Sequence, residues 1–306
     1  MCLEVQIGNS TFSNPILVAS GTFGYGFEIH ELVDVNRLGG IITKSVTLHP
    51  REGNPPPRIC ETASGMLNSI GLANVGVEYF LEKIMPEYSN LEPQLIINIA
   101  GRTQEEYSET LEKIESHGGC HVGYEINISC PNVREGGMEF GISARMTEKL
   151  TRELRQLTNR LLIMKLSPNV TLIEDIARAA EQGGADAVSA INTLVGMEID
   201  IRTRRPKLFT TYGGLSGPAI KPVALARVHK IHQAITIPII GMGGIASCED
   251  VVAFMLAGAS LVQIGTLNFR EPAIAVRLVE ELTHYVLDEY DGKLRDLVGA
   301  VELYDQ

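Results

Sequence analysis

The apolar stretch VGYEINI (residues 122–128) runs directly into the polar stretch SCPN (residues 129–132). The first part is typical of a buried strand, because its side chains form a nearly continuous apolar run. A residue before proline is pushed towards extended conformations, so Cys130 does not easily begin a helix. The sequence therefore predicts a strand that ends in a loop, with a thiol presented between the carboxamides of Asn127 and Asn132. Carboxamides can hydrogen-bond a flat polar ligand without adding charge.

Short apolar runs of this kind recur along the chain and alternate with helical patterns. We expect strands at residues 16–19, 40–44, 94–99, 124–128, 161–166, 187–191, 238–241 and 261–264. We expect helices at residues 103–117, 143–158, 171–182, 221–234, 247–257 and 272–290, with Thr103 and Ser143 as N-caps and Pro272 at a first helical position. Eight strands that alternate with helices predict an α/β fold of the (β/α)8 TIM-barrel type, formed by residues 1–306 as a single domain.

Three other features refine this prediction. No G-x-G-x-x-G follows the first strand, which weakens the rival prediction of a doubly wound open sheet. Residues 3–12 alternate like a small N-terminal hairpin that could plug the bottom of the barrel. Residues 47–76 and 196–218 exceed normal loop length, and we expect them to be long loops on the active-site face.

Composition excludes several classes of protein. The 306 residues carry a formal net charge of −11, which disfavours nonspecific binding to nucleic acid. No apolar stretch is long enough to span a bilayer, and the N-terminus lacks the basic and apolar regions of a signal peptide, so we expect a cytoplasmic protein. The five cysteines form no C-x-x-C pair and the seven histidines no metal-like grouping, so we expect no metal and no iron–sulfur cluster on this chain.

Two lysines stand at the ends of apolar strands, where an unpaired charge is costly. Lys44 and Lys165 would therefore meet an anion or an electron-rich cofactor. The alternative is a buried salt bridge with a carboxylate of the barrel. Glu125 is the one obvious acid nearby, and the sequence does not say which way it faces.

Glycines follow the seventh and eighth expected strands. Loops at these places in a barrel commonly bind phosphate, because bare backbone N–H groups can point at the anion. Gly243, Gly244, Gly265 and Thr266 fit that role. The alternative is that these glycines only relieve strain in tight turns.

Several motifs together resemble one family. The segments NISCPN (127–132), NSIGL (68–72) and ASGTFG (19–24), with the two glycine motifs, look like those of class 1 dihydroorotate dehydrogenases. The resemblance runs from about residue 3 to the last helix. Cys130, where membrane-linked class 2 enzymes carry Ser, supports class 1. The runs SGTFGYG and NVREGG look most like subclass 1B, the catalytic subunit of the NAD-linked enzyme.

The resemblance implies one FMN per chain at the carboxyl ends of the strands. Its phosphate would lie on Gly243, Gly244, Gly265 and Thr266, with Gly217 nearby, and its flavin would be lined by Ser20, Gly21, Lys44, Ser45, Asn98, Asn127, Lys165 and Ile191. Dihydroorotate would be held by Lys44, Asn68, Ser69, Ile70, Gly71, Leu72, Asn127, Asn132, Asn192 and Thr193. Cys130 would take a proton from C5 while a hydride leaves C6 for the flavin, giving orotate for pyrimidine biosynthesis.

The resemblance also implies a partner subunit. Subclass 1B enzymes have a homodimer core flanked by two electron-transfer subunits, which carry FAD and a [2Fe–2S] cluster and pass electrons to NAD. Two related alternatives are the fumarate-dependent subclass 1A enzyme and a dihydropyrimidine dehydrogenase subunit. A flavin-free phosphosugar isomerase or synthase barrel is an alternative from a different class.

Overall fold

Eight parallel strands close into a barrel in this computed structural model, which describes residues 3–29, 31–128 and 140–304. In chain order the barrel strands are β3 (Ile16–Val18), β4 (Gly40–Ile42), β7 (Gln94–Ile99), β8 (Gly123–Asn127), β9 (Leu161–Lys165), β10 (Ala187–Ala190), β15 (Ile239–Met242) and β16 (Leu261–Ile264). Each strand pairs with the next in sequence, and β16 pairs with β3 to close the ring. The predicted (β/α)8 barrel is confirmed, and each strand was placed to within two residues at either end.

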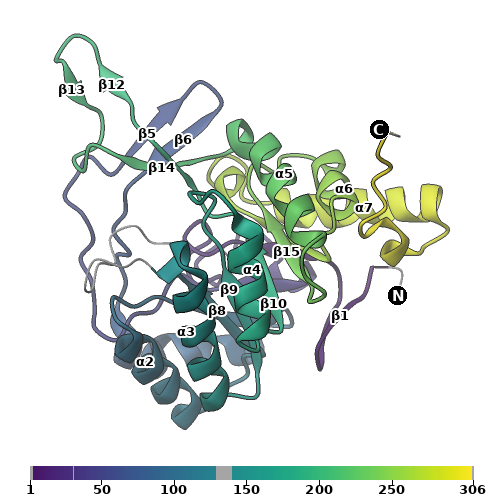
Figure 1. Ribbon diagram of the computed structural model, residues 1–306, viewed down its shortest axis with the longest axis horizontal. Helices are drawn as coiled ribbons and strands as arrows, with labels where there is room; N and C mark the ends of the chain where they lie inside the picture. Colours follow the sequence, from purple (N-terminus) through teal and green to yellow (C-terminus); the bar gives the residue numbers. More distant parts are fainter. Residues whose placement is uncertain (1–2, 30, 129–139, 305–306) are drawn as a thin grey trace.

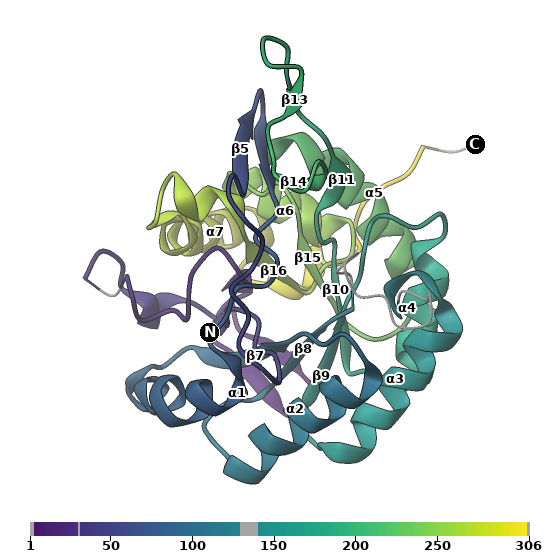
Figure 2. The same ribbon diagram turned by 90° about the vertical axis from the view of Figure 1, so that its left-hand side faces the viewer.

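Helices surround the barrel strands (Figure 2). They are α1 (Gly76–Tyr79), α2 (Gln104–His117), α3 (Ala144–Leu157), α4 (Ile173–Gln182), α5 (Lys221–His232), α6 (Cys248–Leu256) and α7 (Ile274–Tyr290). Shorter helical segments are η1 (Val35–Arg37), η2 (Phe80–Ile84), η3 (Met85–Asn90), η4 (Phe140–Ile142), η5 (Pro218–Ile220), η6 (Thr266–Phe269) and η7 (Leu294–Leu297).

The helix ends test three local predictions. Thr103 and Ser143 are N-caps as predicted, each accepting a hydrogen bond from a backbone N–H in the first turn of its helix. The prediction for Pro272 is wrong, because α7 begins at Ile274 and Ala273 occupies the capping position. The preceding turn, in which Ile274 N–H bonds to Glu271 C=O, holds Pro272 outside the helix.

The bottom of the barrel is filled from within the chain. Strands β1 (Val5–Ile7) and β2 (Ser10–Phe12) form the expected antiparallel hairpin. Its buried Ile7 and Phe12 belong to one apolar cluster with inward-facing residues near the starts of the barrel strands, among them Leu17, Leu161 and Leu261. The hairpin therefore closes the end of the barrel opposite to the strands' carboxyl ends.

The two long segments contain strands rather than irregular loops alone. A four-stranded antiparallel sheet, called here the projecting sheet, is formed by β5 (Ile59–Thr62), β6 (Gly65–Asn68), β14 (Gly213–Ser216) and β11 (Leu194–Gly196). A further pair, β12 (Ile199–Asp200) and β13 (Arg205–Pro206), extends outward beyond it (Figure 1). The strands inside these insertions were not predicted, because β6 and β14 lie about 150 residues apart in sequence and neither signals its partner locally.

A buried histidine lies near the start of β8. The His121 side chain is fully buried, and its Nε2 lies 2.8 Å from the Tyr124 hydroxyl, which donates to the Glu115 carboxylate. Arg160 lies 3.6 Å from the same carboxylate. Burial, helped by the charge of Arg160 and opposed by that of Glu115, lowers the pKa of His121 to about 4.

Acid should therefore destabilise the protein through His121. An unfolded histidine has a pKa near 6.5. Below that pH the histidine binds a proton in the unfolded chain, whereas buried His121 stays neutral in the folded chain until the pH approaches 4. The stabilisation is complete above pH ~6.5 and falls by about 2–3 kcal/mol by pH 4.5, at 1.36 kcal/mol for each unit of pKa difference. We expect urea unfolding of His121→Gln to lose less stability between pH 7 and pH 4.5 than the parent protein. Replacing the exposed His284 with Gln is the control; an equal loss in all three proteins would contradict the assignment.

Candidate active site

A ring of buried polar side chains lies inside the barrel, one layer above the apolar bottom. Side chains alternate along a strand, so residues two apart share a face. Inward-facing residues of β7, β8, β9, β10 and β16 at this level are Asn98, Glu125, Lys165, Ser189 and Gln263, each at most 4% exposed. Each group of this ring needs a polar partner, because an unpaired polar group in the interior is costly.

Glu125 is the centre of the ring. Its Oε2 accepts from Lys165 Nζ at 3.1 Å and from Asn98 Nδ2 at 2.6 Å. Its Oε1 accepts from Ser189 Oγ at 2.8 Å and from Gln263 Nε2 at 2.6 Å. Burial alone raises the pKa of the Glu125 carboxyl, but the Lys165 charge and the hydrogen bonds outweigh it and hold the pKa below its ordinary value.

The two strand-end lysines have different environments. Lys165 forms the buried salt bridge with Glu125 that the sequence left open as the alternative. Lys44 is partly exposed, and among the described residues its side chain forms no ion pair. Its backbone N–H bonds to Gly24 C=O, which ties the end of β4 to the loop after β3.

The other residues predicted to line the flavin lie around the same mouth. Ser45 Oγ donates to Asn98 Oδ1 at 2.6 Å, and Asn127 stands opposite Lys165 in the register of β8 and β9. Ile191 follows β10, where its N–H bonds to Met242 C=O. Ser20 and Gly21 lie in the loop after β3, and Gly21 is exposed with no atom near the position of a Cβ.

The glycine loops converge on a second part of the mouth. A Cβ on Gly244 would lie 2.8 Å from Gly217 C=O and 2.9 Å from the backbone N of Lys221, the first residue of α5. Gly217, Gly243 and Gly244 all have positive φ, between 83° and 123°. Thr266 Oγ1 donates to Ser216 Oγ at 2.7 Å, and Gly265 caps η6. Backbone with no side chains beside a helix N-terminus is the arrangement that binds phosphate.

The residues predicted to hold the substrate lie on the projecting sheet and beside it. Asn68 Nδ2 donates to Gly214 C=O at 3.3 Å, and Gly214 packs against the Thr193 side chain. Ser69 Oγ accepts from Asn54 and from Thr210, and Asn192 Oδ1 accepts from the Thr193 N–H. After them Ile70 is exposed, while Gly71 and Leu72 both have positive φ in the turn that ends the segment. The structure therefore brings residues 68–72 next to the loop after β10.

Two predicted site residues cannot be placed. Cys130 and Asn132 lie outside the described residues, as does the rest of 129–139. Asn127, the last residue of β8, marks where this segment begins, and its C=O accepts from the Tyr107 hydroxyl at 2.7 Å.

Sequence reasoning missed part of the polar ring and its surroundings. Ser189 and Gln263 were not predicted, and the orientation of Glu125 was left open. Side chains two residues apart on a strand share a face, so Glu125 lies on the same face as Asn127. Because Asn127 and Lys165 were both predicted to face the flavin, this alternation would have placed Glu125 on the inner face with Lys165. Gly65, whose Cα lies 2.9 Å from a Cβ placed on Gly217, carried no local signal, because its role depends on pairing between distant segments.

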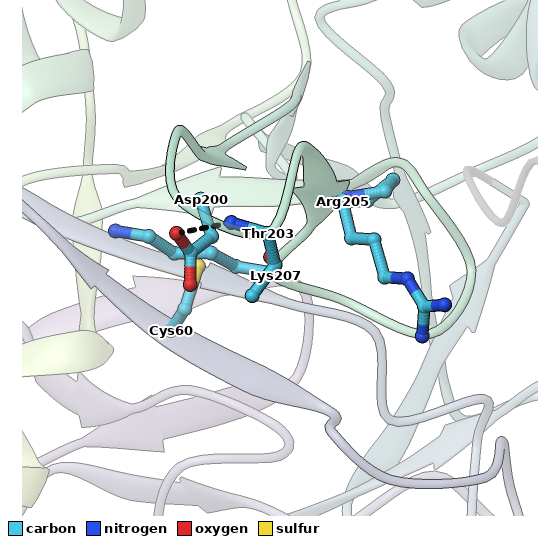
Figure 3. Close-up of a pocket in the computed structure, with 6 residues that line it drawn as sticks. Cys60, Asp200, Thr203, Arg205 and Lys207 are labelled. Atoms are coloured by element: carbon cyan, nitrogen blue, oxygen red, sulfur yellow. Dashed lines mark hydrogen bonds between the residues drawn. The ribbon is translucent and has the colours of Figure 1, made fainter.

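A hollow of about 660 Å³ lies elsewhere, on the projecting hairpins (Figure 3). Asp200 there accepts hydrogen bonds from the backbone N–H groups of Arg202 and Thr203, which explains its lowered pKa. The hollow is lined by Cys60, Asp200, Thr203, Arg205, Pro206 and Lys207. None of these residues follows a barrel strand, so the hollow is not part of the mouth.

The described residues contain neither a metal-binding cluster nor a membrane-spanning helix. Residues 3–29, 31–128 and 140–304 contain no group of three or more histidine, cysteine or acidic side chains arranged to hold a metal ion. Over the same residues, no helix combines the length and apolar character needed to cross a bilayer.

The fold and this mouth define a (β/α)8-barrel enzyme whose polar groups meet at the carboxyl ends of the strands. A family profile described as dihydroorotate dehydrogenase matches residues 2–286. The chain belongs to the dihydroorotate dehydrogenase family.

Named relatives and a solved structure agree with this assignment. The protein called dihydroorotate dehydrogenase B (NAD(+)), catalytic subunit, of Bacteroides thetaiotaomicron is 48% identical over 98% of this chain and 99% of its own length. Proteins of the same name from Phocaeicola vulgatus and Desulforamulus reducens are each 49% identical, with the same coverage. The crystal structure of the Eimeria tenella enzyme in complex with ferulenol superposes with a TM-score of 0.82 at 23% identity, covering 98% of this chain and 88% of that one, which supports the fold.

Proposed function

We propose that this chain is the catalytic subunit that oxidises dihydroorotate to orotate in de novo pyrimidine biosynthesis, with NAD⁺ as the final electron acceptor. One observation carries the proposal: a buried ring with a lysine and amides and a glycine-lined helix N-terminus meet at one barrel mouth, in a member of this family. The names of the relatives favour NAD⁺ over fumarate, and the family favours dihydroorotate over uracil, thymine or a phosphosugar.

The residues at the mouth fit FMN. Gly217, Gly243, Gly244, Gly265 and Thr266 would hold the phosphate. A Cβ on Gly244 or Gly217 would collide with backbone, so these loops come together closely and leave backbone N–H groups without side chains beside a helix N-terminus. Gln263 Oε1 is buried without a hydrogen-bond partner among the described residues, which leaves an acceptor in the ring for a donor on a bound ligand. FMN would supply the hydride acceptor that no side chain offers.

The side chains would then have separate tasks. Lys165 and Lys44 place positive charge near an electron-rich ring, while Asn127, Asn68 and the segment after it orient the substrate. Asn192, Thr193 and Asn132 complete that set. Cys130 would remove the proton at C5, a role that a thiol near neutral pH can perform if nearby dipoles or cations favour the thiolate.

Electron transfer requires a partner in this proposal. The chain has no C-x-x-C pair, so the [2Fe–2S] cluster would lie on an electron-transfer subunit, and we place the FAD on that subunit as well. We propose two catalytic and two electron-transfer subunits around a homodimer core, in the cytoplasm. Exposed apolar side chains on the projecting sheet, Ile59 and Val195, and Phe209 in the segment that leads into β14, suit a subunit contact.

The test is an assay of orotate formation by the purified chain, alone and with the product of a neighbouring gene. We expect a yellow protein that reduces NAD⁺ only when the partner is present. A colourless protein without bound FMN would contradict the flavin site. Fumarate reduction by the isolated chain would instead assign it to the subclass that acts alone.

Gly244→Val tests the phosphate site directly. The valine side chain would meet Gly217 C=O and the first turn of α5, so FMN affinity should fall about tenfold to hundredfold, as expected for one or two lost hydrogen bonds to a charged group. FMN binding can be measured by fluorescence titration. Gly118→Val is the matched control, because Gly118 also has positive φ but has open space around it and lies at the far end of α2. Equal FMN affinity in the two variants would contradict the placement.

A further inference from the structure

Glu125 stands out as a buried charge to which no catalytic task has been given. It is 0% exposed, and its two oxygens accept from four strands of the barrel. A buried charge is costly unless it is paired and hydrogen-bonded, and here both conditions are met. The same stability could be reached with apolar side chains, so stability alone does not explain a carboxylate at this position.

The carboxylate changes what Lys165 presents to the mouth. The two side chains are 3.1 Å apart, with exposures of 6% and 0%, so little water screens the pair. Seen from the mouth, the negative charge of Glu125 offsets part of the positive charge of Lys165. Among the described residues Lys165 has no other carboxylate within ion-pair distance.

We infer that Glu125 is a positioning residue that holds Lys165 and makes the reduced state of the bound flavin less favourable. The inference rests on the proposed FMN site. Reduction adds negative charge to the flavin ring; Lys165 favours that charge and Glu125 opposes it, so the pair stabilises reduced FMN less than a lone lysine would. NAD⁺ is a weak oxidant, and electrons leave for it more easily from a flavin whose reduced form is not strongly stabilised.

Variants at residues of this ring can test the effect of the Glu125 charge separately from the effect of its hydrogen bonds. Glu125→Gln keeps the size of the side chain but removes the charge. Ser189→Ala removes one hydrogen bond to the same carboxylate and keeps the charge. The amide NH2 of a glutamine at this position would face groups that donate hydrogen bonds to Glu125. Glu125→Met is therefore a second neutral variant that introduces no donor. A double variant, Glu125→Gln with Asn98→Asp, returns one carboxylate to the ring on the adjacent strand.

The experiment measures the midpoint potential of FMN and the Kd of oxidised FMN in the purified holoenzymes. In either neutral variant we expect reduced FMN to gain at least tenfold in affinity relative to oxidised FMN, a rise of about 30 mV for a two-electron couple. Ser189→Ala should change the ratio less than threefold, and the double variant should return towards the parent value. A purely structural role would weaken both states equally and leave the potential unchanged.

The outcomes distinguish this inference from the proposed function. If the parent protein does not bind FMN, the proposed function fails. If the parent binds FMN and the neutral variants have an unchanged or lower potential, the role of Glu125 is wrong while the flavin site stands.

Discussion

Cys130→Ser is expected to lower kcat for dihydroorotate oxidation by about 10²–10⁴-fold at neutral pH, the range typical of a lost general base. A thiol has an ordinary pKa near ~8.5 and can reach the thiolate with modest help, whereas a serine hydroxyl is a much weaker acid. The remaining activity should continue to rise up to a higher pH than the activity of the parent protein does. FMN content should not change, because the proposed phosphate and ring contacts come from other residues. The measurement is orotate formation between pH 6 and pH 10.

Cys120→Ser is the matched control for this variant. Cys120 is an exposed free cysteine at the other end of β8, and its replacement should leave kcat unchanged. Full activity of Cys130→Ser at neutral pH would exclude Cys130 as the base.

Lys165→Met is expected to lower the free energy of unfolding of the cofactor-free protein by about 3–5 kcal/mol at pH 8, because it leaves the Glu125 carboxylate buried without its countercharge. In this variant the pKa of Glu125 should rise above its unfolded value, since burial then dominates. The folded protein would bind a proton more tightly than the unfolded chain, so the deficit should shrink as the pH falls. Urea unfolding at pH 8 and pH 5 measures both effects.

Two further variants test the cause of this loss. Lys113→Met breaks a surface ion pair with Glu78, which solvent screens, and should change stability little. Adding Glu125→Gln to Lys165→Met should recover part of the lost stability, because the two residues are coupled. A loss that is independent of pH and unrelieved in the double variant would contradict the burial argument.

The barrel could be predicted because its determinants are local. A parallel strand covered by helices is apolar on both faces, and β9 is a five-residue example that ends at Lys165. The N-caps at Thr103 and Ser143 could be predicted because a hydroxyl directly before a helix can accept a hydrogen bond from a backbone N–H of the first turn. The glycines after β15 and β16 were identified because the positions of strand ends in a barrel are known once the strands are known.

The remaining features depend on contacts between distant segments. Glu125 was recognised as an acid near Lys165, but whether the two side chains meet depends on the register of β8 with β9. The projecting sheet requires β6 to meet β14, and the strand GGLS has too little apolar character to be read as a strand. The roles of Cys130 and Asn132 stay predictions from sequence, since both lie outside the described residues.

The pairing of β6 with β14 makes one piece of backbone serve two binding events. Gly214 pairs with Asn68, at the start of the proposed substrate segment. Ser216, which directly precedes the proposed phosphate-binding Gly217, pairs with Met66. A ligand that draws either strand inward must move the ladder that the other ligand uses. If binding at either site shifts these strands, the affinities for cofactor and substrate would be linked reciprocally through them.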